Sequence, residues 1–175
     1  MKLFLSGEGP DELGDWYRLP QHRSNPPVRG ILEALVHKLG PVRGEVQNVL
    51  GLMVEAEEAG ADVLVFVRDQ DGYEDRQDDI EEGLRRAEAR GDMPRVVGGV
   101  AVQEIEAWIL ALHGERRSEQ HADAKAVLRA RHAIADLDEK VAVIEGADLT
   151  QIPEDAASLH IWLKRARIVL IAQAP

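Results

Sequence analysis

The stretch Val63-Leu64-Val65-Phe66-Val67 decides the fold, because all five residues are apolar and three of them are β-branched. A short run of this kind predicts a strand that is buried on both faces, as in a parallel sheet covered by helices. The polar segment Arg68-Asp69-Gln70-Asp71-Gly72 follows it directly and contains residues that favour turns. The sequence therefore predicts a buried strand that ends in two closely spaced aspartates.

Two further strands are predicted on either side of this one. The first is Lys2 to Ser6, which ends in the turn Gly7-Glu8-Gly9-Pro10. The other is Arg95 to Val102, in which Gly98-Gly99 indicates a bulge or a close approach between segments. Apolar residues recur at helical spacing between the strands. This alternation predicts an α/β fold with a parallel sheet, right-handed crossovers and flanking helices.

The chain is expected to form a single domain over residues 1–175, with an α/β core at about 1–113 and a mostly helical extension at about 114–175. No internal repeat or low-complexity linker divides it. The helix between the second and third strands is expected to be exposed and to carry the ion pairs Glu81/Arg85 and Glu82/Arg86. Helices of the extension are predicted at about Asp123 to His132, Asp138 to Ile144 and Glu154 to Ile171.

Composition excludes several classes of function. The absence of cysteine rules out disulfides, thiolate metal sites and cysteine nucleophiles. A net charge of −11 argues against a protein that grips nucleic acid unaided, so metal ions, local basic patches or a partner would have to offset the repulsion. No signal-peptide pattern and no membrane-spanning apolar run occur in the sequence, so we expect a cytoplasmic protein without membrane contact.

Acidic residues follow each of the three predicted strands. Because ligands bind outside the carboxyl ends of parallel strands, these carboxylates are expected to converge on one edge of the sheet. Carboxylate oxygens suit Mg²⁺ or Mn²⁺, and two such ions can stabilise both oxygens exchanged in phosphoryl transfer. Solvated turns and acidic helix N-termini are the alternative interpretations. The candidate metal ligands are Glu8, Glu12, Asp69, Asp71, Glu104 and Glu106.

The spacing of these acids refines the expectation. Asp69 and Asp71 would point to one side if the strand continued past them. Glu104 and Glu106 are two residues apart and would not share a helical face, which suggests that only one of them is a ligand. Trp108 is expected in the core. The six histidines lack ligand spacing to one another and are expected at the surface or at helix ends.

Taken together in their order, Glu8-Gly9, Asp69-x-Asp71 and Glu104-x-Glu106-Ala107-Trp108 resemble the motifs of the Toprim superfamily. The closest likeness is to small Toprim-like proteins of unknown function that are related to overcoming-lysogenization-defect (OLD) nucleases. It covers about residues 1–113, with a weaker likeness near Asp123-Ala124-Lys125 and in the last helix, Ser158 to Arg167. It implies a Toprim-like (Rossmann-like) fold and Mg²⁺- or Mn²⁺-dependent hydrolysis of phosphodiester bonds in nucleic acid. The implied roles are a metal ligand or general acid/base for Glu8, a second acid for Glu12, a metal-binding pair for Asp69 and Asp71, an extra acid for Glu104 or Glu106, and transition-state charge stabilisation for Lys125.

Other features bear on substrate and partners. Arg18 and Arg23, in the loop after the first motif, could contact phosphate, or they could be solvated loop charges. No tyrosine stands where a topoisomerase needs its nucleophile, and no P-loop is present, so the ATPase of many relatives would have to be a separate partner in DNA repair or phage defence. A homodimer is left open.

Two other interpretations of the sequence remain. The strand followed by Asp69-Gln70-Asp71-Gly72 also resembles haloacid-dehalogenase phosphatases, in which Asp69 would be the nucleophile. Against this, the motif normally opens the chain and is followed by Thr, whereas Tyr73 follows here. The alternative to any enzyme is a regulatory or scaffold Toprim-like domain whose acids bind one ion or none.

Overall fold

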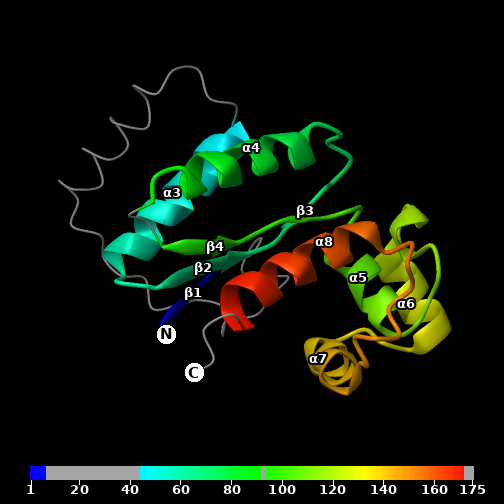
Figure 1. The fold of residues 1–175 in the computed structure, drawn as a ribbon. Coiled ribbons are helices and arrows are strands. Elements are labelled where there is room, and N and C mark those ends of the chain that lie inside the picture. Colours follow the sequence, from blue (N-terminus) through cyan, green and yellow to red (C-terminus); the bar gives the residue numbers. More distant parts are fainter. Residues whose placement is uncertain (7–43, 92–93, 172–175) are drawn as a thin grey trace.

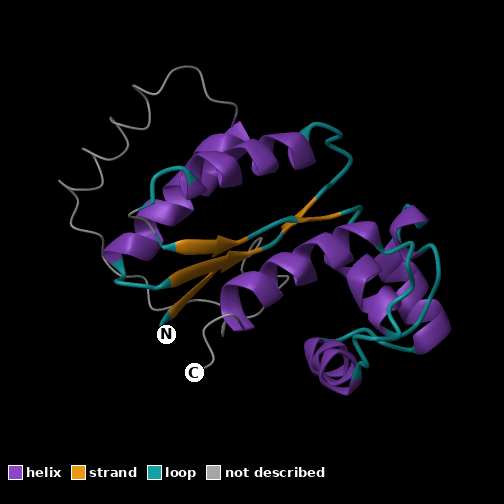
Figure 2. Cartoon of the chain, viewed as in Figure 1, coloured by secondary structure: helices purple, strands orange, loops and turns teal. Residues whose placement is uncertain are grey.

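The computed structural model describes residues 1–6, 44–91 and 94–171. Within these ranges the chain is an α/β structure with a small parallel sheet flanked by helices, as predicted (Figure 1, Figure 2). Glu8, Glu12, Arg18 and Arg23 lie outside the described residues. The strands are β1 (Leu3–Ser6), β2 (Val63–Phe66), β3 (Arg68–Asp69), β4 (Arg95–Val97) and β5 (Val100–Ala101).

The sheet has β2 at its centre, with β1 and β4 on either side and all three strands parallel. β3 continues the course of β2 and pairs in parallel with β5, which continues β4. The predicted strand Arg95 to Val102 is therefore divided in two, and β3 forms in the polar segment after Val67 that was expected to be a turn. The division falls at Gly98-Gly99, where a Cβ on Gly98 would lie 2.2 Å from Cε1 of Phe66. The close approach expected of this glycine pair is confirmed.

Helices cover both faces of the sheet. α3 and α4 pack together on one face, and their apolar side chains form a core with Leu64 and Phe66 of β2. α8 runs along the other face, and α5, α6 and α7 gather beyond the end of the sheet (Figure 1). The helices are α3 (Gly44–Glu58), α4 (Arg76–Glu88), α5 (Ile105–Leu112), α6 (Ala124–His132), α7 (Leu137–Gly146) and α8 (Ala157–Ala166), with the short turns η2 (Ser118–Gln120) and η3 (Arg167–Ile171).

The last helix differs from the prediction at both ends. α8 begins at Ala157 rather than at about Glu154, because the carboxylate of Glu119 accepts hydrogen bonds from the backbone N–H groups of Ser158 and Leu159 and so satisfies its first turn. At Arg167 the α-helix gives way to the π-helical turn η3. The spacing of apolar residues predicts neither the contact with Glu119 at the start of α8 nor the change of helix type at its end.

The prediction of two ion pairs within α4 is confirmed for Glu82/Arg86 and wrong for Glu81/Arg85. Glu82 binds Arg86 at 2.6 Å, as predicted, and it also takes Arg85 at 2.7 Å. Glu81 pairs instead with Arg165 of α8. Because Arg165 also donates to the carbonyl of Gly98, this contact joins helices on opposite faces of the sheet past its β4 edge.

The helices beyond the sheet have a core of their own, in which Leu110 of α5 packs with Leu128 of α6, and the opposite side of α5 packs against α8. Trp108 of α5 is only 5% exposed, and its indole N–H donates to the Ser158 hydroxyl at 2.6 Å, which confirms that it is a core residue. α6 starts at the N-cap Asp123, and α7 starts with a capping box between Asp136 and Glu139. No helix in residues 1–6, 44–91 and 94–171 is both long and apolar enough to cross a bilayer.

Candidate functional site

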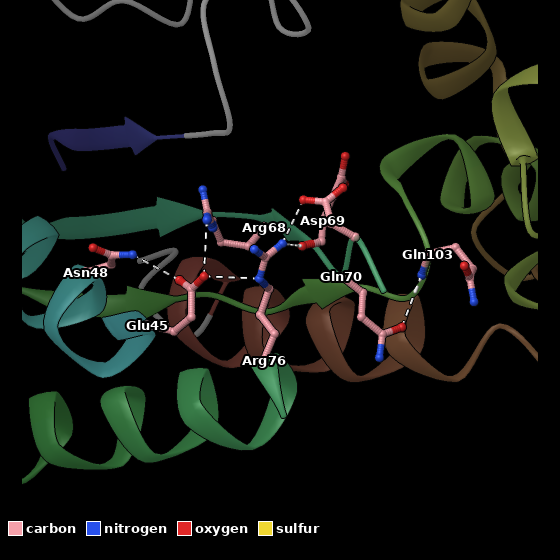
Figure 3. Close-up of polar contacts among 8 residues, drawn as sticks. Glu45, Asn48, Arg68, Asp69, Gln70, Arg76 and Gln103 are labelled. Atoms are coloured by element: carbon pink, nitrogen blue, oxygen red, sulfur yellow. Dashed lines mark hydrogen bonds and ion pairs between the residues drawn. The ribbon is translucent and has the colours of Figure 1, made fainter. Parts of the chain in front are cut away.

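The candidate site is the acidic edge, which we define as Asp69, Asp71, Glu104 and Glu106 after the carboxyl ends of β3 and β5. Backbone contacts hold the two turns side by side. Gln70 donates its N–H to the Ala101 carbonyl at 3.0 Å, and Asp71 donates its N–H to the Gln103 carbonyl at 3.3 Å. In return, the Gln103 N–H reaches the side-chain oxygen of Gln70 at 3.3 Å (Figure 3). The structure therefore brings the turn that carries Asp71 directly beside the segment that leads to Glu104.

The two aspartates do not share a strand face. β3 ends at Asp69, and Asp71 adopts a left-handed backbone with φ 50°, followed by Gly72 with φ 71°. The regular alternation that would align the two side chains is therefore lost in a tight turn. Asp69 is 8% exposed, whereas the Asp71 side chain is 52% exposed. The pair presents one buried and one open carboxylate.

An arginine that the sequence analysis did not single out occupies this turn. Arg76, at the start of α4, is 9% exposed, and its Nη1 donates to Asp71 Oδ2 at 2.8 Å and to the backbone carbonyl of Asp69 (Figure 3). Its Nε lies 3.0 Å from Glu45 Oε1 at the start of α3. The guanidinium thus links the aspartate turn to α3, which comes before β2 in the sequence. No spacing rule in the sequence points to Glu45.

Glu45 is itself held by several cations and donors. Arg68 approaches its Oε1 at 3.2 Å, and Asn48 donates to its Oε2 at 3.1 Å. Burial raises the pKa of Glu45, but the Asn48 hydrogen bond and the Arg68 and Arg76 guanidinium groups outweigh it and hold that pKa below its ordinary value. The anionic form of Glu45 is therefore favoured, and it anchors both arginines behind the aspartate turn.

Glu104 lies at the N-cap of α5 and faces the start of α6. Its carboxylate accepts the backbone N–H of Lys125 at 2.6 Å. Burial raises the pKa of Glu104 above its ordinary value, and the negative charges of Glu106 and Asp123 act in the same direction. The structure thus brings Lys125, the lysine expected to stabilise charge, next to one of the two glutamates of the third motif.

Glu106 has a different environment. It is 4% exposed, and Lys140 of α7 reaches its Oε1 at 2.6 Å. The Lys140 side chain is itself only 15% exposed, so the pair is largely removed from water. This contact joins α5 to α7 across 34 residues of sequence. Glu106 therefore already has a protein cation as its partner.

The carboxylates of the acidic edge provide the donor chemistry that Mg²⁺ and Mn²⁺ prefer, since both ions take oxygen ligands. Asp71 could serve as a ligand only if Arg76 releases its carboxylate. Among the described residues, no group of three or more histidine, aspartate or glutamate side chains is placed to hold a metal as it stands. Any fuller ligand set at this edge would draw on Glu8 or Glu12, which lie outside those residues.

A second polar cluster was not foreseen from the histidine spacing. Glu115, just after α5, accepts His132 Nε2 at 2.9 Å and His121 Nε2 at 3.1 Å, and it also pairs with Arg131. The rings of His113 and His132 lie 4.2 Å apart. Two of the six histidines therefore bind one carboxylate and a third packs against one of them, at intervals that match no common metal motif.

Comparison with protein-family models, with curated proteins and with solved structures found no match to this chain.

Proposed function

We propose that this protein is a Toprim-type, Mg²⁺- or Mn²⁺-dependent phosphodiesterase that acts on nucleic acid. The observation that carries the proposal is the placement of Asp69 and Asp71 at the end of one parallel strand, tied through Gln103 to the turn that precedes Glu104. Carboxylates on neighbouring strand ends suit an ion that must be held in a fixed position. The order of the acidic motifs along the chain supports the assignment.

In this proposal the residues at the acidic edge have different roles in metal binding and charge stabilisation. Asp69 and Asp71 hold the ion, together with Glu8, and a bound divalent ion supplies Lewis-acid stabilisation of the phosphoryl oxygens. Arg76 must release the Asp71 carboxylate, which it holds at 2.8 Å. Lys125, whose backbone N–H binds Glu104, would use its ammonium group to stabilise negative charge that develops on the phosphate.

The test is cleavage of labelled DNA and RNA in the presence of Mn²⁺ or Mg²⁺. Asp69→Asn and Asp71→Asn should each abolish metal-dependent cleavage, because an amide keeps the shape but loses the charge that binds the ion. Glu58→Gln is the control, since Glu58 is an exposed acid at the end of α3, next to the amino ends of the strands. Full cleavage in both aspartate variants would refute the proposal.

A non-catalytic regulatory or scaffold role is the second candidate, and a specific observation favours it. Asp71 and Glu106 are each paired with a basic side chain, and Glu104 accepts a backbone N–H, so three acids of the edge already serve as structural ties. If this is their whole role, no divalent ion will stimulate cleavage, and Asp71→Asn will leave cellular function intact. The same two variants therefore separate the candidates.

A separate ATPase partner, in DNA repair or phage defence, belongs to the nuclease proposal as its cellular setting. Its support is the lack of a P-loop in this sequence. Purification of the protein under native expression tests it: an ATPase should copurify, and its consistent absence would count against the partner without touching the metal-dependent chemistry.

A further inference from the structure

A basic corner lies beyond the C-terminal end of α5, in a chain whose net charge is −11. We define the corner as Arg116 and Arg117, in the turn after α5, together with Arg129 on α6. All three residues are exposed, and none forms an ion pair within the part of the chain that the structure describes. Residues 113–132 contain five lysines and arginines against three acids. The corner is therefore a local reversal of the overall charge.

The contacts of Glu115 hold the corner together. This carboxylate binds His121, Arg131 and His132, which draws the turn after α5 against the C-terminal half of α6. Arg116 follows Glu115 directly, and Arg129 lies three residues before His132, on the same side of α6. Arg131 compensates the charge of Glu115. Glu115 thus leaves the positive field of the corner largely intact.

α5 connects the basic corner to the acidic edge. The helix begins directly after Glu104 and spans eight residues, which corresponds to about 12 Å at the helical rise of 1.5 Å per residue. No residue of α5 is exposed, so a nucleic-acid strand would cross this distance over the segments that cover the helix, with one phosphate at the acidic edge and later phosphates near the arginines. Such an arrangement overcomes the repulsion between an acidic protein and a polyanion, because the attraction lies where the strand extends away from the carboxylates.

We infer that the basic corner binds the phosphate backbone of a nucleic-acid strand and positions that strand across the acidic edge. The inference rests on the proposed function for the identity of its ligand. It assigns to Arg116, Arg117 and Arg129 a positioning role that the metal-binding motifs do not include. Since these contacts are to phosphates, they bind without regard to sequence and weaken as salt rises.

The experiment measures binding apart from cleavage. Fluorescein-labelled 20-nucleotide single-stranded DNA and RNA are titrated with the full chain in EDTA, and anisotropy gives Kd at several salt concentrations. Arg116→Glu/Arg129→Glu should raise Kd at least tenfold and reduce the slope of log Kd against log salt by about 1 to 2 units, at roughly 0.7 for each phosphate that the protein no longer neutralises. The matched control is Arg85→Glu/Arg90→Glu, which changes the net charge equally at exposed positions of α4 and just beyond it.

The outcomes distinguish this inference from the proposed function. If the wild type does not bind either oligonucleotide, or if both double variants lose affinity equally, the corner is not a nucleic-acid site. If Asp71→Asn abolishes cleavage but binds normally, both proposals are supported. Binding that depends on the corner, without cleavage by the wild type, would support the inference and overturn the nuclease proposal. Arg116→Gln/Arg129→Gln, with half the charge change, should give an intermediate Kd and replaces the reversal if that variant does not fold.

Discussion

Arg76→Gln should destabilise the fold and expose the aspartate turn, because Arg76 joins three elements through one largely buried guanidinium. The contact with the exposed Asp71 side chain contributes little, about 0.5 kcal/mol. The ion pair with Glu45 counts for more, since the Glu45 side chain is only 16% exposed. It should contribute about 1.5 to 2.5 kcal/mol, less than the about 3 to 5 kcal/mol for breaking a fully buried pair, because Glu45 keeps Arg68 and Asn48 as partners. With about 1 kcal/mol for the bond to the Asp69 carbonyl, the expected loss is about 3 to 4 kcal/mol.

Urea unfolding followed by circular dichroism measures this loss. With a denaturant slope of about 2 kcal/mol per molar, the midpoint should fall by about 1.5 to 2 M. A double-mutant cycle with Glu45→Gln should show a coupling energy of at least about 1 kcal/mol. Arg86→Gln is the control on the same helix, because its pair with Glu82 is exposed, and it should cost less than about 1 kcal/mol. A loss below about 1 kcal/mol for Arg76→Gln, with no coupling to Glu45, would refute the reasoning.

The same variant tests what Arg76 does at the proposed metal site. An ion that binds only the folded state raises stability by RT ln(1 + [L]/Kd). Mn²⁺ should raise the unfolding midpoint of Arg76→Gln by more than it raises that of the wild type, because no guanidinium then competes for the Asp71 carboxylate. Adding Asp71→Asn to both proteins should abolish this difference in the Mn²⁺ effect between Arg76→Gln and the wild type. No effect of Mn²⁺ on either protein would contradict metal binding at this edge.

Three further changes should act through contacts that the structure identifies. Gly98→Ala should lower the free energy of unfolding by about 1 to 3 kcal/mol, because its Cβ would lie 2.2 Å from Cε1 of Phe66, and urea titration would detect this. Lys140→Met should cost about 3 to 5 kcal/mol, because it leaves the 4% exposed Glu106 without its cation, and an unchanged melting temperature would contradict this interpretation. Burial raises the pKa of Glu115, but the hydrogen bonds from its two histidines and the charge of the neighbouring arginine outweigh burial and hold that pKa below its ordinary value. The Glu115 carboxylate therefore stabilises the fold at pH above its ordinary pKa and loses this effect as pH falls through the lowered pKa. The difference in free energy of unfolding between wild type and Glu115→Gln should therefore narrow in acid unfolding curves.

The sequence was sufficient to predict the sheet because its evidence is local. An all-apolar run at residues 63–67 and turn-forming residues on either side indicate a buried parallel strand, whatever the rest of the chain does. The parallel pairing of β1, β2 and β4 confirms that prediction. The extent of the strands was harder to predict, since the break at Gly98 depends on where the Phe66 ring lies.

The partners of the acidic edge could not be predicted, because they come from distant parts of the sequence. Arg76 reaches Glu45, and Lys140 reaches Glu106, across 31 and 34 residues of sequence, and no periodicity encodes such contacts. Glu81 shows the same limit: its helical neighbour Arg85 was expected, but Arg165 of α8 is its partner. Local rules indicate which acids come after a strand, whereas the tertiary fold determines which cations meet them.

These partners also bear on which glutamate of the third motif could serve as an extra metal ligand. Glu106 is buried against Lys140, so recruiting it would leave an unpaired ammonium inside the protein, at a cost of several kcal/mol. Glu104 forms no ion pair with a lysine or arginine of the described ranges; it accepts a backbone N–H and lies among other acids. A divalent ion near Glu104 would relieve that repulsion rather than break a buried pair. If an ion binds at this edge, Glu104 is therefore the expected ligand and Glu106 the structural tie between α5 and α7.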